Sequence, residues 1–207
     1  MRRPLRGYTV VEVMIAMSIL TIAAAGLISL QRVSTVGNMQ AKELAVASHV
    51  ARTWVDRLHV DSTRWNFPSP AYPTDVSDLN DTIWLRNVRT IPNVWFRPTD
   101  SAQGTAAFDA LGNNLPQNGT DPAVFCANLR LGWLNPPNPT RPGDPESIRV
   151  AVRVHWRRAK VFQVAGGIAP APLCNVSAVE LDTPAKSPLA QFHLLYEMTS
   201  VAKQVMQ

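Results

Sequence analysis

The chain has 207 residues, of which 46% are hydrophobic and 17% are charged, with 17 prolines and 2 cysteines. Its length suits one domain, or one domain with an appendage, and its composition excludes both a wholly disordered chain and a small scaffold held by many disulfides. The net charge of +5 is not a nucleic-acid signature, because residues 1–7 hold three of the twenty basic residues and leave 17 basic against 15 acidic residues elsewhere.

The N-terminal region joins a short basic segment to a long apolar run. Residues 13–31 contain no charged residue, and a helix of this length crosses roughly 28 Å of hydrocarbon at about 1.5 Å per residue. No other run is long enough, which excludes a multi-span transporter. Two ordinary interpretations are a secretory signal peptide, which the length and the missing cleavage site fit poorly, and a simple anchor with its basic end in the cytoplasm.

Neither interpretation explains Glu12, an acidic residue at the start of the apolar region. A carboxylate in such a segment costs at least ~2.5 kcal/mol at the bilayer centre and less near the interface, so it predicts a cationic partner at the same depth. Cleavage between Gly7 and Tyr8 would supply that partner. The new α-amine of Tyr8 would lie at the head of the helix, close in height to Glu12 of a staggered neighbour.

Residues 6–12 (RGYTVVE), followed by the apolar run, resemble the class III signal of type IV pilins and type II secretion pseudopilins. The resemblance implies that a prepilin peptidase cleaves after Gly7 and that Tyr8 becomes N-methylated. It also implies that Glu12, the fifth residue of the mature chain, neutralises the amine of an adjacent subunit during assembly.

Two further stretches, residues 22–31 and 41–57, are similar to the PilV type of minor pilin and to the minor pseudopilin I of type II secretion. The resemblance covers roughly residues 6–60 and is much weaker beyond. It implies an α+β type IV pilin fold, with a long N-terminal helix from about residue 8 to 60 packed against an antiparallel sheet. The expected parts are a cleaved leader at 1–7, a hydrophobic transmembrane and assembly half-helix at 8–31, an amphipathic half-helix at 32–62 and a periplasmic head at 63–207.

An apolar stripe continues the helical pattern beyond the membrane-spanning run. Its members recur at spacings of three and four residues: Leu44, Ala47, Ala51, Trp54 and Leu58. The opposite side carries charged residues that we expect to face solvent: Lys42, Glu43, Arg52, Asp56 and Arg57. The spacing therefore predicts one amphipathic helix whose apolar stripe packs into a head domain.

Prolines mark the head, since sixteen of the seventeen lie between Pro68 and Pro188 and predict loops there. Four shorter runs are strand-like: 82–91, 125–133, 148–156 and 192–201. The third alternates most clearly, with apolar residues on one side and Arg149, Arg153 and His155 on the other, which predicts a solvated polar face. Together the runs predict a twisted antiparallel sheet with one face against the C-terminal half of the helix.

Cys126 and Cys174 are the two cysteines of the chain. The predicted topology places both outside the cytoplasmic membrane, where oxidation is possible, so we expect a disulfide; two free buried thiols are the alternative. No nucleophile, phosphate-loop or zinc signature occurs, so we expect neither an enzyme nor a bound cofactor or metal. The acidic run Asp75, Asp78 and Asp81 lacks the spacing of an EF-hand.

A basic strand face could contact DNA phosphates, and its residues are Arg149, Arg153, Arg157, Arg158 and Lys160. Without aromatic stacking platforms, the pattern favours a solvated face over nucleic-acid binding.

The resemblance implies a minor pilin, a structural subunit that is held in the inner membrane by a single span with its head in the periplasm. It would then be incorporated into a type IV pilus, at the tip, supporting motility and adhesion. The implied partners are other minor pilins, the major pilin, prepilin peptidase, the inner-membrane assembly platform and a tip adhesin. The alternatives are a minor pseudopilin of type II secretion and a pilin-stalked module that binds DNA or a surface.

Overall fold

The computed structural model describes residues 9–66, 79–99, 103–116, 123–137, 140, 146–157, 174, 181 and 192–203. Its contacts divide the chain into two units, Met1–Leu44 and Ala45–Gln207. A single helix, α1 (Val10–Asn66), contributes to both units and ends six residues later than the sequence pattern predicts. The two units differ in kind, because the first is described as helix alone and the second combines helix, turns and a sheet.

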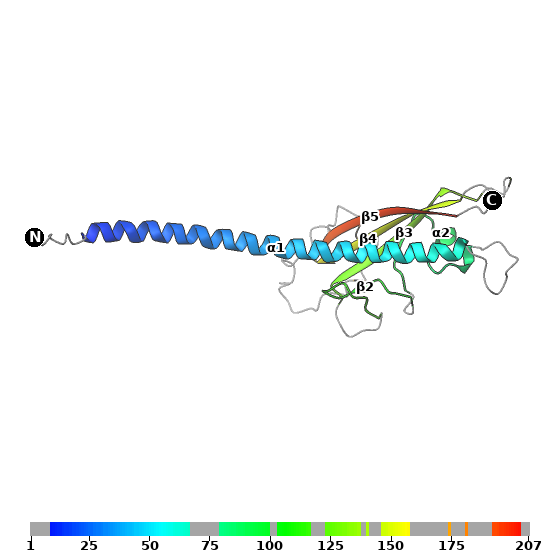
Figure 1. Cartoon of the computed structure of the whole chain (residues 1–207), viewed down its shortest axis with the longest axis horizontal. Coiled ribbons are helices and arrows are strands. Elements are labelled where there is room, and N and C mark those ends of the chain that lie inside the picture. The colour runs from blue at the N-terminus through cyan, green and yellow to red at the C-terminus, as the bar shows by residue number, and fades with distance from the viewer. Residues whose placement is uncertain are drawn as a thin grey trace, which may run out of the picture. The chain divides into compact units, whose positions relative to one another are not determined.

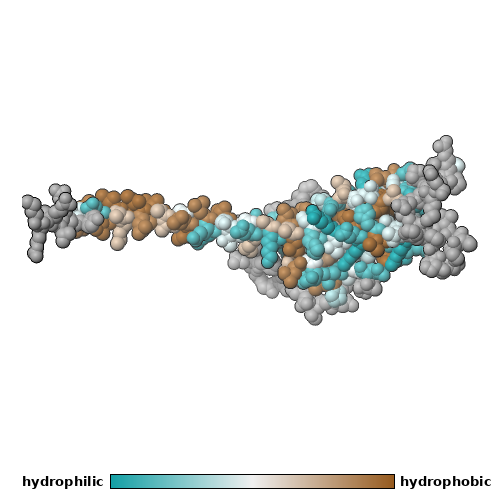
Figure 2. Space-filling model, in the orientation of Figure 1, coloured by the Kyte–Doolittle hydropathy of each residue, from teal (hydrophilic) through white to brown (hydrophobic). Residues whose placement is uncertain are grey.

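In the first unit, α1 is exposed along almost its whole length, with one partly buried position at Glu43. Figure 2 shows apolar side chains over the part of this segment that follows the N-terminus. Two hydroxyl groups in its apolar run bond to the helix itself: Ser18 donates to the carbonyl of Met14 (2.8 Å), and Thr21 donates to the carbonyl of Ser18 (2.8 Å). These polar groups therefore need no water, which suits an apolar environment.

The second unit contains a five-stranded antiparallel sheet (Figure 1). Its strands are β1 (Trp95–Phe96), β2 (Ala107–Phe108), β3 (Phe125–Asn135), β4 (Ser147–Arg157) and β5 (Phe192–Ala202). The order is β1-β3-β4-β5, and β2 also pairs with β3. The predicted strands at 125–133, 148–156 and 192–201 are confirmed, each within one of the three 11-residue strands.

The predicted strand at 82–91 is wrong. This segment follows the short 3-10 helix η1 (Leu79–Asp81) as turns and then forms α2 (Asn87–Thr90). The hydroxyl of Thr82 accepts a hydrogen bond from the N–H of Arg86 (2.8 Å). The N–H groups of the three residues between them, 83–85, donate to the carboxylate of Asp61 in α1. Because these N–H groups have side-chain partners, they are not available to a sheet ladder.

The core of the second unit lies between α1 and one face of the sheet. The predicted stripe is buried at Ala47, Ala51, Trp54 and Leu58, and these side chains join one apolar cluster with strand residues. The strand members of that cluster include Leu129, Leu131, Ile148, Val150, Val152 and Val154. Leu44 was predicted as part of the stripe, but it is 49% exposed and falls in the first unit.

The other face of the sheet is the solvated surface that the sequence pattern predicts only at one end, where Arg149 is exposed. Arg153 and His155 are both 0% exposed. The Arg153 guanidinium carbon lies 4.4 Å from the ring centroid of Trp95, and the His155 ring contacts Phe192 edge-on at 6.0 Å. Aromatic side chains from β1 and β5 cover these polar residues, which strand alternation alone does not indicate.

Candidate functional site

The N-terminal processing segment is only partly described, since the structure begins at Thr9. Gly7 and Tyr8 lie outside the described residues. Thr9 occupies the N-cap of α1, where its Oγ1 accepts a hydrogen bond from the N–H of Glu12 (3.3 Å) and its carbonyl oxygen accepts from the same group (3.1 Å). Thr9 and Glu12 thus form the Thr-x-x-Glu pattern of a capping box, in which one of the two reciprocal bonds is present. This local role was missed from the sequence, although the spacing signals it.

Glu12 lies in the first turn of α1, where its negative charge interacts favourably with the helix dipole. It is exposed, and it forms no ion pair within the part of the chain that the structure describes. The large apolar residues that surround it along residues 10–36 are between 46% and 76% exposed. Within one chain, nothing described covers this apolar surface or neutralises the carboxylate.

The same helix contains an 18-residue window that is apolar enough to cross a membrane, and none of that window is buried inside the protein. A helix that is apolar on all sides is normally buried in lipid or among other helices. The N-terminal segment is therefore suited to two environments, the hydrocarbon of a bilayer and the interior of a helical assembly.

The two cysteines lie together at the start of β3. The structure pairs Cys126 with Cys174, with their Cα atoms 5.4 Å apart. Cys126 is buried in a second apolar cluster with Leu181 and Phe192, and Cys174 packs against it. The guanidinium of Arg97 donates to the carbonyl oxygen of Cys174, which holds this position to the loop after β1. The pair therefore joins a central strand to the segment between β4 and β5.

A buried carboxylate that the sequence analysis did not single out organises the end of α1. Asp61 is 2% exposed. Its Oδ1 accepts from the N–H of Ile83 (2.8 Å), and its Oδ2 accepts from the N–H groups of Trp84 (2.9 Å) and Leu85 (3.1 Å). Asp61 lies three residues after Leu58 and so continues the spacing of the apolar stripe. An acidic residue at a position that this spacing assigns to the core was the signal from which the sequence could have identified it.

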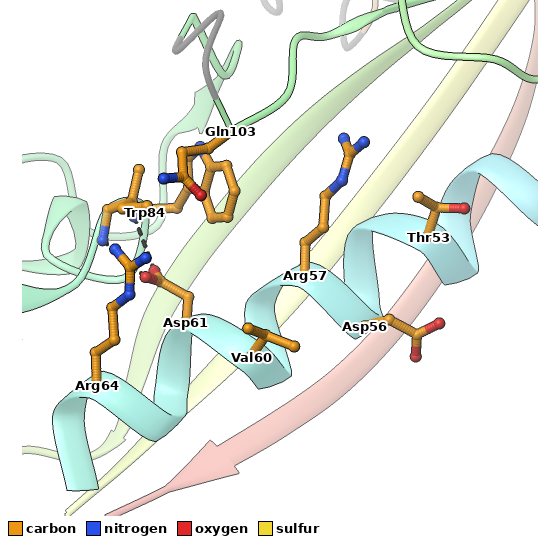
Figure 3. A pocket seen from close by; sticks show the side chains of 9 residues that line it. Thr53, Asp56, Arg57, Val60, Asp61, Arg64, Trp84 and Gln103 are labelled. Carbon is orange, nitrogen blue, oxygen red and sulfur yellow. Dashed lines mark hydrogen bonds between the residues drawn. The ribbon is translucent and has the colours of Figure 1, made fainter. Parts of the chain in front are cut away.

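Asp61 lies at the floor of a pocket of about 300 Å³ (Figure 3). One face of α1 supplies six of its lining residues, at spacings of three and one, and the loop after η1 and the segment before β2 supply the rest. The lining residues are Thr53, Asp56, Arg57, Val60, Asp61, Arg64, Ile83, Trp84 and Gln103. A helix face, a turn and a loop thus meet around a hollow with both cationic and apolar walls.

Arg57 was expected to face solvent but is partly buried in this wall. Its guanidinium carbon lies 5.0 Å from the ring centroid of Trp54, and that ring meets Trp84 edge-on at 5.3 Å. Burial lowers the pKa of the Arg57 guanidinium from its ordinary value, because desolvation disfavours the charged form. Gly104 makes the close approach possible: a Cβ there would lie 2.8 Å from Cζ of Arg57, and the backbone φ of +136° also favours glycine.

No metal centre is present among the described residues, where no group of three or more His, Cys, Asp or Glu side chains could hold an ion. Asp81 ends η1, whereas Asp75 and Asp78 lie outside the described ranges.

The prokaryotic N-terminal methylation motif matches residues 2–28. No curated protein and no solved structure matches the chain. The motif supports a type IV pilin-like protein, and it implies processing by prepilin peptidase and anchoring of the apolar helix in the inner membrane before assembly. The long helix packed on an antiparallel sheet is an α+β fold of the type IV pilin kind. The match ends at residue 28, inside α1, so it does not extend to the sheet or to the pocket.

Proposed function

We propose that this protein is a minor pilin of the PilV type, a structural subunit that helps to initiate a type IV pilus and is incorporated at its tip. The observation that carries the proposal is the coincidence of the methylation motif with an apolar helical segment that nothing described in the chain covers. A subunit with this segment is held in the membrane first and packs among neighbouring helices later, so one surface serves both states.

In this proposal, cleavage after Gly7 exposes the α-amine of Tyr8, which is N-methylated, and Glu12 of a neighbouring subunit pairs with that amine. Glu12 is exposed in the first turn of α1, so its carboxylate is accessible to a neighbouring subunit. The head contacts other minor pilins, the major pilin or a tip adhesin, and the Cys126–Cys174 disulfide stabilises it in the periplasm. The polymerisation machinery of the family supplies the ATP hydrolysis that drives assembly.

Intact-mass analysis and N-terminal sequencing of the protein purified from cells test the processing step. We expect a chain that begins with methylated Tyr8, and retention of Met1 would refute the proposal. Glu12→Gln removes the charge and keeps the side-chain size, so we expect normal cleavage with loss of incorporation into pili. Glu12→Asp is the matched control, because it keeps the charge and should restore part of the incorporation.

The methylation motif is shared with pseudopilins, so a minor pseudopilin I of type II secretion is the second candidate. Deletion of the gene, scored for surface pili and for protease secretion in the same strain, separates the two. We expect loss of pili with normal secretion; the reverse result would assign the chain to the secretion system. The DNA-binding alternative is weakened because Arg153, a central residue of its basic face, is buried.

A further inference from the structure

Three buried N–H donors without an acceptor gather beside the Asp61 pocket. Two belong to residues that line the pocket, Nε1 of Trp84 and Nη1 of Arg57, and the third is Nε1 of Trp54, whose ring contacts both of these residues without lining the pocket. None of the three has a hydrogen-bond partner among the described residues. Trp84, which lines the pocket, is 5% exposed. Buried polar groups in proteins are nearly always paired, because an unpaired buried donor has lost its hydrogen bond to water without gaining another. Donors clustered at one hollow therefore indicate an acceptor that the described residues do not provide.

The charges of the pocket also favour an anion. Arg57 and Arg64 rise from the same side of α1, whereas the carboxylate of Asp56 points away from Arg57 (Figure 3). The remaining acid, Asp61, already accepts three backbone N–H bonds, which compensate its negative charge inside the protein. The groups left to meet a ligand are thus two guanidinium cations and an indole N–H.

We propose that this pocket binds a carboxylate group. A carboxylate has acceptors only, and its planar pair of oxygens matches the fork of an arginine guanidinium while leaving a lone pair for an indole N–H. The volume of about 300 Å³ is at the small end of ligand sites. It accommodates an acidic side chain with its neighbouring backbone, or a small free acid, and it excludes large cofactors.

Two sources share this chemistry, an Asp or Glu side chain of another subunit and a free small carboxylate. The first source rests on the proposed function, because a pilus subunit is surrounded by neighbours. Carboxylate binding by the isolated chain does not rest on it, so the pocket can be tested whether or not the protein is a pilin.

The indole N–H signals of the full-length protein in detergent micelles provide the assay. Acetate and succinate are titrated against sodium chloride of equal ionic strength, with phosphate as a tetrahedral anion, and the six tryptophan signals are followed by ¹H–¹⁵N NMR. The Trp84 signal is identified from its absence in Trp84→Phe. We expect a saturable shift of the Trp84 N–H with the carboxylates and none with chloride.

Arg57→Gln should weaken carboxylate binding about 10- to 100-fold, since a hydrogen bond to a charged group contributes about 1.5–3 kcal/mol. Arg64→Gln should weaken it by a smaller factor, because Arg64 is exposed. Arg52→Gln is the matched control on the same helix, because Arg52 is exposed and does not line the pocket. Unchanged affinity in Arg57→Gln, an equal shift with chloride, or tighter binding of phosphate would overturn the proposal.

The source is identified in assembled pili with a photo-crosslinking amino acid in place of Gln103, which is exposed at the rim of the pocket. A crosslinked peptide from another subunit with Asp or Glu at the attachment point assigns the pocket to a neighbouring side chain. If the NMR titration shows carboxylate binding and no such peptide forms, the pocket belongs to a free small acid.

Discussion

Removal of the Asp61 carboxylate should strongly destabilise the second unit. Asp61→Ala leaves three backbone N–H groups without their acceptor. That of Ile83 is only partly buried and can be solvated, but those of Trp84 and Leu85 are buried. At about 1–3 kcal/mol for each buried donor, the expected loss is about 4 kcal/mol, a large share of the 5–15 kcal/mol that usually stabilises a protein.

Guanidinium chloride unfolding at a fixed detergent concentration, followed by tryptophan fluorescence, measures this loss. All six tryptophans lie between residues 54 and 156, inside the second unit, so the signal does not report on the apolar helical segment. Asp61→Asn should lower the free energy of unfolding by about half as much as Asp61→Ala. The amide oxygen of Asn can still accept a hydrogen bond, whereas its NH₂ group faces another N–H donor. Asp56→Asn is the control, since Asp56 is exposed on the same helix. A loss below about 0.5 kcal/mol in Asp61→Ala, the range of ordinary surface substitutions, would refute this reasoning.

Three further predictions concern the loops and the cysteine pair. Hydrogen bonds from the side chain and backbone N–H of Asn113, and from the N–H of Leu111, lower the pKa of Asp109, so this acid stabilises its turn above the ordinary pKa of 3.8 and the contribution is lost as pH falls through the lowered value. An NMR titration of the Asn113 amide should have its midpoint below 3.8, and a midpoint at or above 3.8 would contradict the assignment. Gly104→Ala should displace Arg57 and abolish carboxylate binding while the sheet stays folded, as measured by the same NMR titration and by circular dichroism; wild-type affinity would show that the contact is unimportant. Reduction, or Cys126→Ser, should lower the free energy of unfolding by up to about 4 kcal/mol, the chain-entropy value for a sequence separation of 48 residues, and equal stability of reduced and oxidised protein would count against the disulfide.

Much of the fold follows from local patterns. The three- and four-residue spacing predicts the buried stripe of α1, and Trp54 and Leu58 are fully buried as expected. The two-residue alternation predicts β4, whose apolar side faces the helix. Both patterns succeed because neighbours along the chain decide which side chains share a face of a helix or a strand.

The same local patterns mislead where a distant residue intervenes. Residues 82–91 have the β-branched and aromatic composition of a strand, but Asp61 takes the N–H groups that a ladder would need, from more than twenty positions away. Arg153 sits on the polar side of an alternating strand, yet Trp95 from β1 covers it. Composition and periodicity describe one element at a time and cannot show which side chain from another element will reach it.

The sequence of residues 1–31 is enough to predict membrane insertion and processing, because a basic leader, Gly7, Glu12 and an uninterrupted apolar run follow one another in the chain. The structure added the cap at Thr9 to this segment. The pocket, in contrast, exists only after α1, the turn following η1 and the loop at Gln103 have packed together, since its donors come from separate segments. Chemistry encoded in consecutive residues can be recognised before folding, whereas a site formed by long-range packing is created by the fold itself.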